Sequence, residues 1–324
     1  MKKTLTFLFS VLLIFSGICV VPADAAYNDE VNFDAEIVYM ESLDQGTVIF
    51  NKNSKKKTAE ASLTKITTAM VVLENCEDLN AKVVATQEVM DTLAGTNSST
   101  AGITVGEELT VRELLSLMLI KSANEAASIL ADYVGGDIET FIDMMNDFAK
   151  ARGCTNTNYT NPHGLDEDNH YTTAYDMALL ACACLENETV ADICATRSIT
   201  IGTRTFVNHN KLLWRYKDCV GMKTGYTERA GRTLISAACR NGQTLVCVTL
   251  NDGDDWNDHE TLLDHGFSQY PRQTLCEQGQ RFGVIPVSGS LIPVLEVQAA
   301  EAVGYPLTEQ ETLTLEVDMA ECLE

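Results

Sequence analysis

The stretch ASLTKITTAM, residues 61–70, places a serine and a lysine three positions apart at the start of an apolar segment. Its apolar residues recur at intervals of three and four, so we predict a helix over about residues 62–74. On a helix, Ser62 and Lys65 lie on one face, one turn apart. A lysine that is partly buried near other cations has a lowered pKa and can accept a proton from a neighbouring hydroxyl. The spacing therefore suits an activated serine nucleophile.

Ser-x-x-Lys alone is weak evidence, because the chain contains it twice. The other copy, residues 54–57, lies in a hydrophilic loop, which we interpret as a solvated run of charge. Ser62, by contrast, would lie at the positive end of a helix dipole. Whether Ser62 and Lys65 form a catalytic pair or are ordinary residues of a helix depends on the motifs in the rest of the chain.

Two further short motifs follow along the chain. Ser122-Ala123-Asn124 falls between two predicted helices, residues 110–122 and 124–136, where a helix cap is the alternative explanation. Lys223-Thr224-Gly225 falls on a predicted strand, which places Lys223 and Gly225 on one face and Thr224 on the other. The glycine would allow a ligand backbone to come close.

Ser-x-x-Lys, Ser-x-Asn and Lys-Thr-Gly, in this order, resemble the motif set of class A β-lactamases and penicillin-binding proteins. Longer stretches narrow the resemblance to the D-alanyl-D-alanine carboxypeptidases, the low-molecular-mass penicillin-binding proteins. These stretches are EASLTKITTAM at 60–70, residues 106–136, NPHGLDEDNHYTTAYDMA at 161–178, residues 208–231 and LLDHGF at 262–267. The resemblance covers about residues 33–270.

The resemblance implies a role for each matching residue. Ser62 would be the acylated nucleophile, Lys65 its base and Ser122 a proton relay. The substrate would be bound by Asn124, Lys223, Thr224, Gly225 and Tyr226. The backbone N–H groups of Ser62 and Tyr226 would hold the oxyanion. It implies no metal and no cofactor. Its ligands would be peptidoglycan stem peptides ending in D-Ala-D-Ala and β-lactam antibiotics.

The pattern of elements predicts an α/β (α+β) protein with a largely antiparallel sheet. We predict a hairpin at 36–51, helices at 110–122, 124–136, 138–153 and 173–187, a hairpin at 233–250 and a short helix at 259–267. This is the β-lactamase/transpeptidase-like fold of the resemblance, with an inserted all-helical subdomain. We expect a signal peptide at 1–25, a catalytic domain at 26–275 and a partial C-terminal β domain at 276–324, with short strands at 282–298 and 312–317.

The N-terminal sequence indicates where the protein is located, and the net charge of the chain limits the classes of partner that it binds. Lys2 and Lys3 precede an apolar run that ends in Ala23-Asp24-Ala25, a pattern typical of a secretory signal peptide. An uncleaved membrane anchor is the alternative. We therefore expect an exported protein on the cell-wall side of the bacterial cytoplasmic membrane, and leave its membrane attachment open. The formal net charge of −23, with no basic patch, argues against nucleic-acid binding.

The cysteines do not resemble a disulfide framework. Ten of the 11 follow the predicted signal peptide. If Cys239 pairs with Thr244 across the predicted hairpin, Cys247 lies on the opposite face of the sheet and cannot bridge to it. We expect most of these cysteines to be small core residues.

The sequence departs from the family's pattern at several places, and we therefore consider other interpretations of its function. No glutamate between Asn124 and Lys223 has an asparagine four residues later, which argues against a class A β-lactamase. The stretch NDGDDWNDHE, 251–260, lacks the carboxylate-binding arginine of some relatives and should be a solvated loop; Arg229 or Arg232 could substitute. His163 and His170 could ligate a metal, but we favour a structural role. A catalytically silent cell-wall-binding homologue is the alternative from another class.

Overall fold

A computed structural model describes residues 31–44, 46–288 and 293–308. Its centre is a five-stranded antiparallel sheet in the order β2-β1-β9-β8-β7. These strands are β1 (Ile37–Ser42), β2 (Thr47–Lys52), β7 (Cys219–Thr227), β8 (Gly231–Arg240) and β9 (Gln243–Leu250). Strand β7, which carries Lys-Thr-Gly, therefore lies at an edge of the sheet, where one side of its backbone is free of a neighbouring strand.

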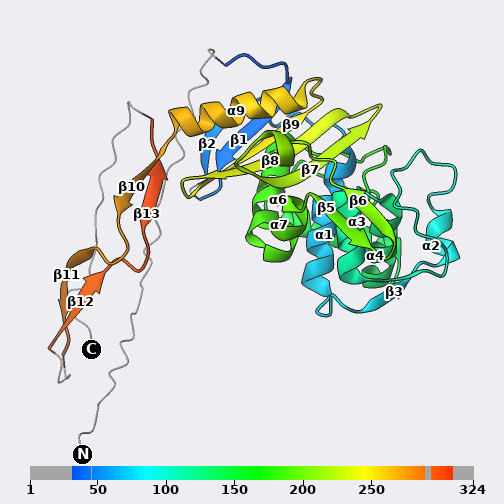
Figure 1. The fold of residues 1–324 in the computed structure, drawn as a ribbon, viewed down its shortest axis with the longest axis horizontal. Helices are drawn as coiled ribbons and strands as arrows, with labels where there is room; N and C mark the ends of the chain where they lie inside the picture. Colours follow the sequence, from blue (N-terminus) through cyan, green and yellow to red (C-terminus); the bar gives the residue numbers. More distant parts are fainter. Residues whose placement is uncertain (1–30, 45, 289–292, 309–324) are drawn as a thin grey trace, which may run out of the picture.

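Helices cover both faces of the sheet (Figure 1). Helix α9 (Asp255–Gln269) packs on one face against β8 and β9. Helices α6 (Ala174–Glu186) and α7 (Glu188–Ala195) pack against the sheet from the other side. Both faces are thus buried, and the strands are apolar on both sides: Leu234 and Leu245 belong to one core cluster, Ile235 and Val246 to the other.

All of the described helices except α9 lie between β2 and β7. Besides α6 and α7, this part of the chain contains η1 (Ala61–Leu63), α1 (Thr64–Asn75), α2 (Gln87–Asp91), α3 (Val111–Ile120), α4 (Asn124–Gly135), α5 (Ile138–Ala151) and α8 (Leu212–Arg215). Two short hairpins accompany them: β3 (Lys82–Val84) with β4 (Glu108–Thr110), and β5 (Ser198–Ile201) with β6 (Arg204–Val207). Thr110 and Glu113 form the expected capping box of α3. The fold is the predicted antiparallel sheet flanked by helices with a helical insertion, but the insertion is not all-helical as predicted, because it contains the hairpin of β3 and β4.

After α9 the chain forms two separate two-stranded sheets that extend away from the body (Figure 1). They pair β10 (Arg272–Cys276) with β13 (Val303–Pro306), and β11 (Arg281–Pro286) with β12 (Val294–Gln298). The predicted strand at 312–317 and the predicted signal peptide at 1–25 lie outside the described residues. Among the described helices, none is long and apolar enough to cross a bilayer.

Two local predictions are corrected by the structure. The closing helix begins at Asp255 rather than at residue 259, so the expected solvated loop at 251–260 is wrong for its second half. Acidic residues in the first turn of a helix interact favourably with its dipole, which explains why this acidic segment is helical. Asp252, Asp255 and Asp258 are moreover buried.

Candidate active site

Ser62 lies in a tight turn that leads into a long helix. The turn η1 is a 3-10 helix, and α1 continues directly from it, so the predicted helix has a tightened first turn. Ala61 has φ of +52°, a left-handed conformation that is uncommon for a residue other than glycine. Gly164 packs on this turn so closely that a Cβ atom there would lie 1.9 Å from the carbonyl oxygen of Ala61. The loop around Gly164 thus holds the serine turn in place.

Lys65 is completely buried beneath Ser62. Its Nζ atom lies 2.8 Å from Ser62 Oγ, 2.8 Å from Asn124 Oδ1 and 2.5 Å from the carbonyl oxygen of His163. Burial, together with the positive charge of Lys223, holds the pKa of Lys65 well below its usual range. As a neutral amine, Lys65 can donate to the two carbonyl-type oxygens and accept the proton of Ser62.

Lys223 forms a second buried lysine site on the edge strand. Its Nζ atom donates to Ser122 Oγ at 2.9 Å and to the carbonyl oxygen of Thr224 at 2.8 Å. Burial lowers the pKa of Lys223 to about 7. Ser122 has φ of +63°, and the residue that precedes α4 is Ala123, which makes no side-chain cap. The helix-cap alternative for Ser122 is therefore wrong, and its hydroxyl is instead bonded to Lys223.

Gly225 allows the edge strand to approach the serine turn. A Cβ atom at this position would lie 2.4 Å from Thr233 Oγ1 and 3.0 Å from both the carbonyl oxygen of Glu60 and the nitrogen of Ser62. The sequence suggested that this glycine makes room for a ligand, whereas here the protein's own backbone occupies the space. A side chain at residue 225 would push Lys223 and Thr224 away from Ser62.

The two lysines lie behind a cavity of about 830 Å³. Five of the predicted site residues line it: Ser62, Ser122, Thr224, Gly225 and Tyr226. The other three, Lys65, Asn124 and Lys223, are buried behind this wall and bonded to it or to each other. All eight residues are therefore brought to one place, although they come from three separate parts of the chain.

The sequence analysis missed much of the cavity wall. The chain has only two tryptophans, Trp214 and Trp256, and both line the cavity. Lys121, His209 and Lys211 line it as well. Partial burial and the positive charges of Lys223, Lys121 and Lys65 lower the pKa of His209 to about 4. Two tryptophans in polar surroundings were a possible signal, but no spacing rule connects them to the serine.

The two candidate arginines occupy different places. Arg232 lines the cavity and pairs with Asp255. Arg229 is not part of the cavity wall; it donates to the carbonyl oxygen of Glu167 and lies 4.0 Å from Asp168. The structure thus separates two residues that the sequence left equivalent.

The histidines and the second Ser-x-x-Lys have other surroundings. The ring of His170 lies 3.1 Å from Glu60 Oε1 through Nε2, and its Nδ1 accepts from the backbone of Thr160. In the described part of the chain, no group of three or more His, Cys, Asp or Glu side chains is arranged to hold a metal. Of residues 54–57, Ser54 is buried, but Lys55, Lys56 and Lys57 are exposed, as expected.

The nine cysteines in the described residues are all free. Cys239 pairs with Thr244 across the β8–β9 hairpin, so the condition stated for the sequence is met, and Cys247 lies opposite Ser236. Five are buried, namely Cys154, Cys184, Cys194, Cys247 and Cys276. Most of the buried ones therefore pack as small core residues.

Comparisons with known proteins agree with one another. The family model described as D-alanyl-D-alanine carboxypeptidase matches residues 24–254. The carboxypeptidase DacF of Bacillus subtilis is 30% identical over 314 residues, which cover 94% of this chain and 81% of the relative. DacB2 of Mycobacterium tuberculosis is 35% identical over 245 residues, which cover 72% and 82%.

Solved structures resemble the chain in the same region. The Streptomyces K15 DD-transpeptidase superposes with a TM-score of 0.70 at 29% identity, covering 73% of this chain and 98% of that one. Penicillin-binding protein 5 of Haemophilus influenzae superposes with a TM-score of 0.73, covering 86% and 84%, and its 24% identity supports the fold alone.

Proposed function

The chain belongs to the D-alanyl-D-alanine carboxypeptidase family, and from this premise we propose that it is an exported serine enzyme that removes the terminal D-Ala from peptidoglycan stem peptides ending in D-Ala-D-Ala. The observation that carries the proposal is the 2.8 Å contact between Lys65 Nζ and Ser62 Oγ at the wall of the cavity. The same site would be acylated by β-lactam antibiotics, which present a reactive carbonyl and a carboxylate.

The reaction is an acyl transfer in two steps. Lys65 takes the proton of Ser62, whose Oγ attacks the carbonyl carbon of the penultimate D-Ala. The backbone N–H groups of Ser62 and Tyr226 stabilise the oxyanion. As the C–N bond breaks, Ser122 gives its proton to the nitrogen of the departing D-Ala and takes one from the ammonium group of Lys223, which donates a hydrogen bond to it. Water then hydrolyses the ester on Ser62 and releases the shortened peptide.

The proposal also covers the residues that bind the substrate and the division of the chain into domains. Asn124, held by Lys65, binds the substrate amide, and Thr224 contacts its carboxylate. We propose that residues 1–25 direct export, that residues 26–275 form the catalytic domain and that residues 276–324 belong to a further β domain. The first alternative is a catalytically silent cell-wall-binding homologue, and the less favoured one is a β-lactamase.

The test is covalent labelling by a fluorescent penicillin. Purified protein without residues 1–25 should be labelled, Ser62→Ala should not, and Ser54→Ala should be labelled normally. Ser54 is the matched control because it opens the second Ser-x-x-Lys. Release of D-Ala from diacetyl-Lys-D-Ala-D-Ala should follow the same pattern. A folded protein that is neither labelled nor active would favour the silent homologue, and rapid turnover of penicillin would favour the β-lactamase.

A further inference from the structure

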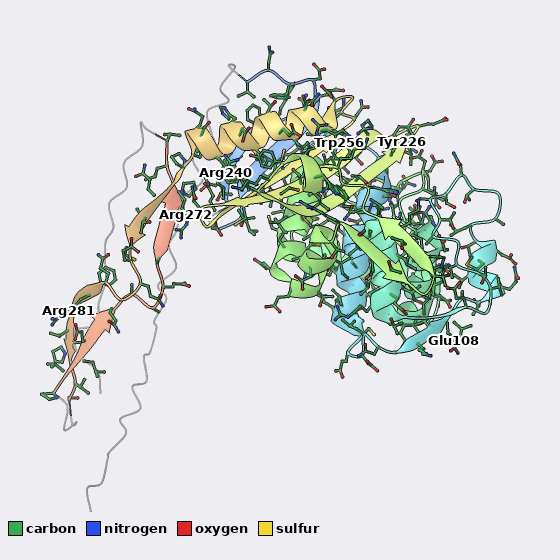
Figure 2. The ribbon with its side chains drawn as sticks, viewed as in Figure 1. Glu108, Tyr226, Arg240, Trp256, Arg272 and Arg281 are labelled. Carbon is green, nitrogen blue, oxygen red and sulfur yellow. The ribbon has the colours of Figure 1, made fainter. Side chains whose placement is uncertain are left out.

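Glu60, two residues before Ser62, is a fully buried acidic residue that the proposed mechanism does not use. It directly precedes η1, yet its side chain makes no cap to that helix. Its carbonyl oxygen accepts a hydrogen bond from Thr233 Oγ1 on β8 at 3.0 Å, and it packs against Gly225 on β7. Figure 2 labels Tyr226, the next residue of β7, and so locates the sheet edge beside Glu60. The backbone of Glu60 is therefore held by the sheet.

The side chain of Glu60 lies against His170, which is also buried. His170 Nδ1 accepts a hydrogen bond from the backbone nitrogen of Thr160 at 3.1 Å, so this ring nitrogen carries no proton. We therefore place the proton of the ring on Nε2. Nε2 lies 3.1 Å from Glu60 Oε1 and 2.9 Å from Thr64 Oγ1. A single buried N–H group thus faces an oxygen atom of Glu60 and one of Thr64.

The hydroxyl group of Thr64 connects this N–H group to the serine turn. Because Thr64 Oγ1 accepts from His170, its own proton is free to donate to the carbonyl oxygen of Ala61, which lies 2.9 Å away. Ala61 is the residue with φ of +52° that precedes Ser62. A left-handed conformation is unfavourable for alanine and persists only where the surrounding structure imposes it. The hydrogen bonds from His170 through Thr64 therefore stabilise the turn that presents Ser62.

His170 also closes the loop that holds Lys65. The loop consists of residues 160–170, and the hydrogen bond from the Thr160 backbone to the His170 ring joins its two ends. Within the loop, the carbonyl oxygen of His163 accepts from Lys65 Nζ at 2.5 Å. A displacement of His170 would therefore move both the turn that carries Ser62 and the carbonyl group that orients Lys65.

We propose that Glu60 and His170 are positioning residues for the acylation step, which keep Ser62 Oγ and Lys65 Nζ at the 2.8 Å distance over which the proton is transferred. This rests on the proposed function and adds two residues to it. Folding alone would favour an apolar side chain at residue 60, because Glu60 Oε2 is buried and has no hydrogen-bond partner in the described part of the chain. The carboxyl group is explained instead by the geometry of the serine turn.

The test separates the rate of acylation from the amount of folded protein. Rapid-quench labelling of the mature protein at several concentrations of fluorescent penicillin gives three quantities: the acylation rate constant, the dissociation constant of the complex before acylation, and the labelled fraction. We expect His170→Leu and Glu60→Leu to lower the rate constant about 10- to 100-fold, the loss expected when a nucleophile is misplaced by about 1 Å. The dissociation constant should change less than about threefold, because neither side chain reaches the cavity.

Conservative variants show whether the polar contact is responsible. His170→Gln keeps an N–H donor near the position of Nε2, and Glu60→Gln keeps an acceptor oxygen, so both should stay within about threefold of the unmodified rate constant. Asp176→Asn is the matched control. Asp176 is buried as well, but its carboxylate accepts from the backbone of Asn156 and from Thr157 Oγ1 rather than from the serine turn. This variant should keep the unmodified rate constant.

Two results with the folded variants would overturn the proposal. An unchanged rate constant with a smaller labelled fraction in both Leu variants would show that Glu60 and His170 contribute to folding alone. Equal losses in the Leu and Gln variants would show that the polar contact does not position Ser62.

A variant that does not fold is replaced by the double variant Glu60→Leu/His170→Leu, in which neither partner is left buried alone. An unchanged rate constant in the double variant, or its failure to fold, would also reject the proposal. The outcome is separable from the proposed function: absence of labelling in the unmodified protein would reject that function and this inference with it. Normal labelling of the unmodified protein, with unchanged rate constants in the variants, would reject this inference alone.

Discussion

Two buried polar clusters lie on opposite sides of the same sheet. On one side, Lys65 and Lys223 are bonded to Ser62 and Ser122. On the other side, beneath α9, His259 is completely buried, with Ser236 Oγ 2.6 Å from Nδ1 and Thr249 Oγ1 2.9 Å from Nε2. Burial lowers the pKa of both lysines and lowers that of His259 to about 3.

The two clusters differ in whether a ligand in the cavity can contact the groups to which their polar atoms are bonded. The lysines are bonded to hydroxyls that line a cavity, so a substrate can meet them. The cluster under α9, which also includes the buried carboxylates of Asp252 and Asp258, is bonded to the protein itself: Asp258 Oδ2 accepts from the backbone nitrogens of Asp34 and Ala35 at 2.8 and 2.7 Å. Burial with a lowered pKa is therefore not sufficient evidence of catalysis, and access to a cavity decides between the two roles.

The largest expected effect is on the acylation rate, and it follows from a substitution in the cluster that contains Lys65 and Lys223. Lys65→Ala removes the proposed base from Ser62, and we expect the rate of penicillin acylation to fall about 10²- to 10⁴-fold. Rapid-quench labelling measures this rate, and Ser236→Ala, under α9, is the control that should keep it. A Lys65→Ala rate within tenfold of the unmodified protein would contradict the assignment of Lys65 as base.

The pH dependence of the reaction tests the other lysine. The proposed mechanism needs Lys223 with its proton and Lys65 without one, and burial lowers the pKa of Lys223 to about 7. We expect kcat/KM for D-Ala release to fall above about pH 7, with a limiting slope of about tenfold per pH unit. A rate that continues to rise to about pH 9 would show that Lys223 is not required in its charged form.

The cluster under α9 should affect stability and leave the chemistry alone. Asp258→Ala leaves the backbone nitrogens of Asp34 and Ala35 without their acceptor, and we expect a loss of about 2–4 kcal/mol in the free energy of unfolding. Urea unfolding measures this loss. Glu108→Ala, which removes an exposed ion pair to Lys82, should cost under about 1 kcal/mol. A changed acylation rate in folded Asp258→Ala would contradict the prediction that the cluster under α9 affects stability alone.

The same cluster should also give the stability a pH dependence. Burial and the charge of Asp258 raise the pKa of Asp252 from 3.8 to about 7. Between these values the folded state holds a proton that the unfolded state has lost, so this group contributes stability at low pH that disappears as the pH rises to about 7. Asp252→Asn should remove this slope, which is at most about 1.4 kcal/mol per pH unit. Urea unfolding at several pH values compares the two proteins, and equal slopes would contradict the prediction.

The sequence by itself determined the local elements. Two apolar runs on either side of an Asn241-Gly242 turn identified the hairpin of β8 and β9, in which Cys239 meets Thr244. Helical periodicity and a capping box located α3. The order of three short motifs identified the family and the eight residues that the structure brings together. These features depend on neighbours in the chain, so they are visible without a fold.

The sequence did not determine several elements with weaker local signals. Helix α7 and the hairpin of β5 and β6 were not predicted, since they are short and carry mixed polar and apolar residues. Their placement depends on packing against α3, α6 and β7. Tertiary contacts override local propensity in segments of this length.

Only the tertiary structure decided which residues surround the serine. Trp256, Lys211 and Arg232 meet at one end of the cavity although they lie up to 45 positions apart in the chain. Arg229 and Arg232, equivalent in the sequence, end in different surroundings because β8 begins between them. Distances between such residues are set by the sheet edge, the close packing at Gly225 and the helices behind it. No periodicity in the sequence records those distances.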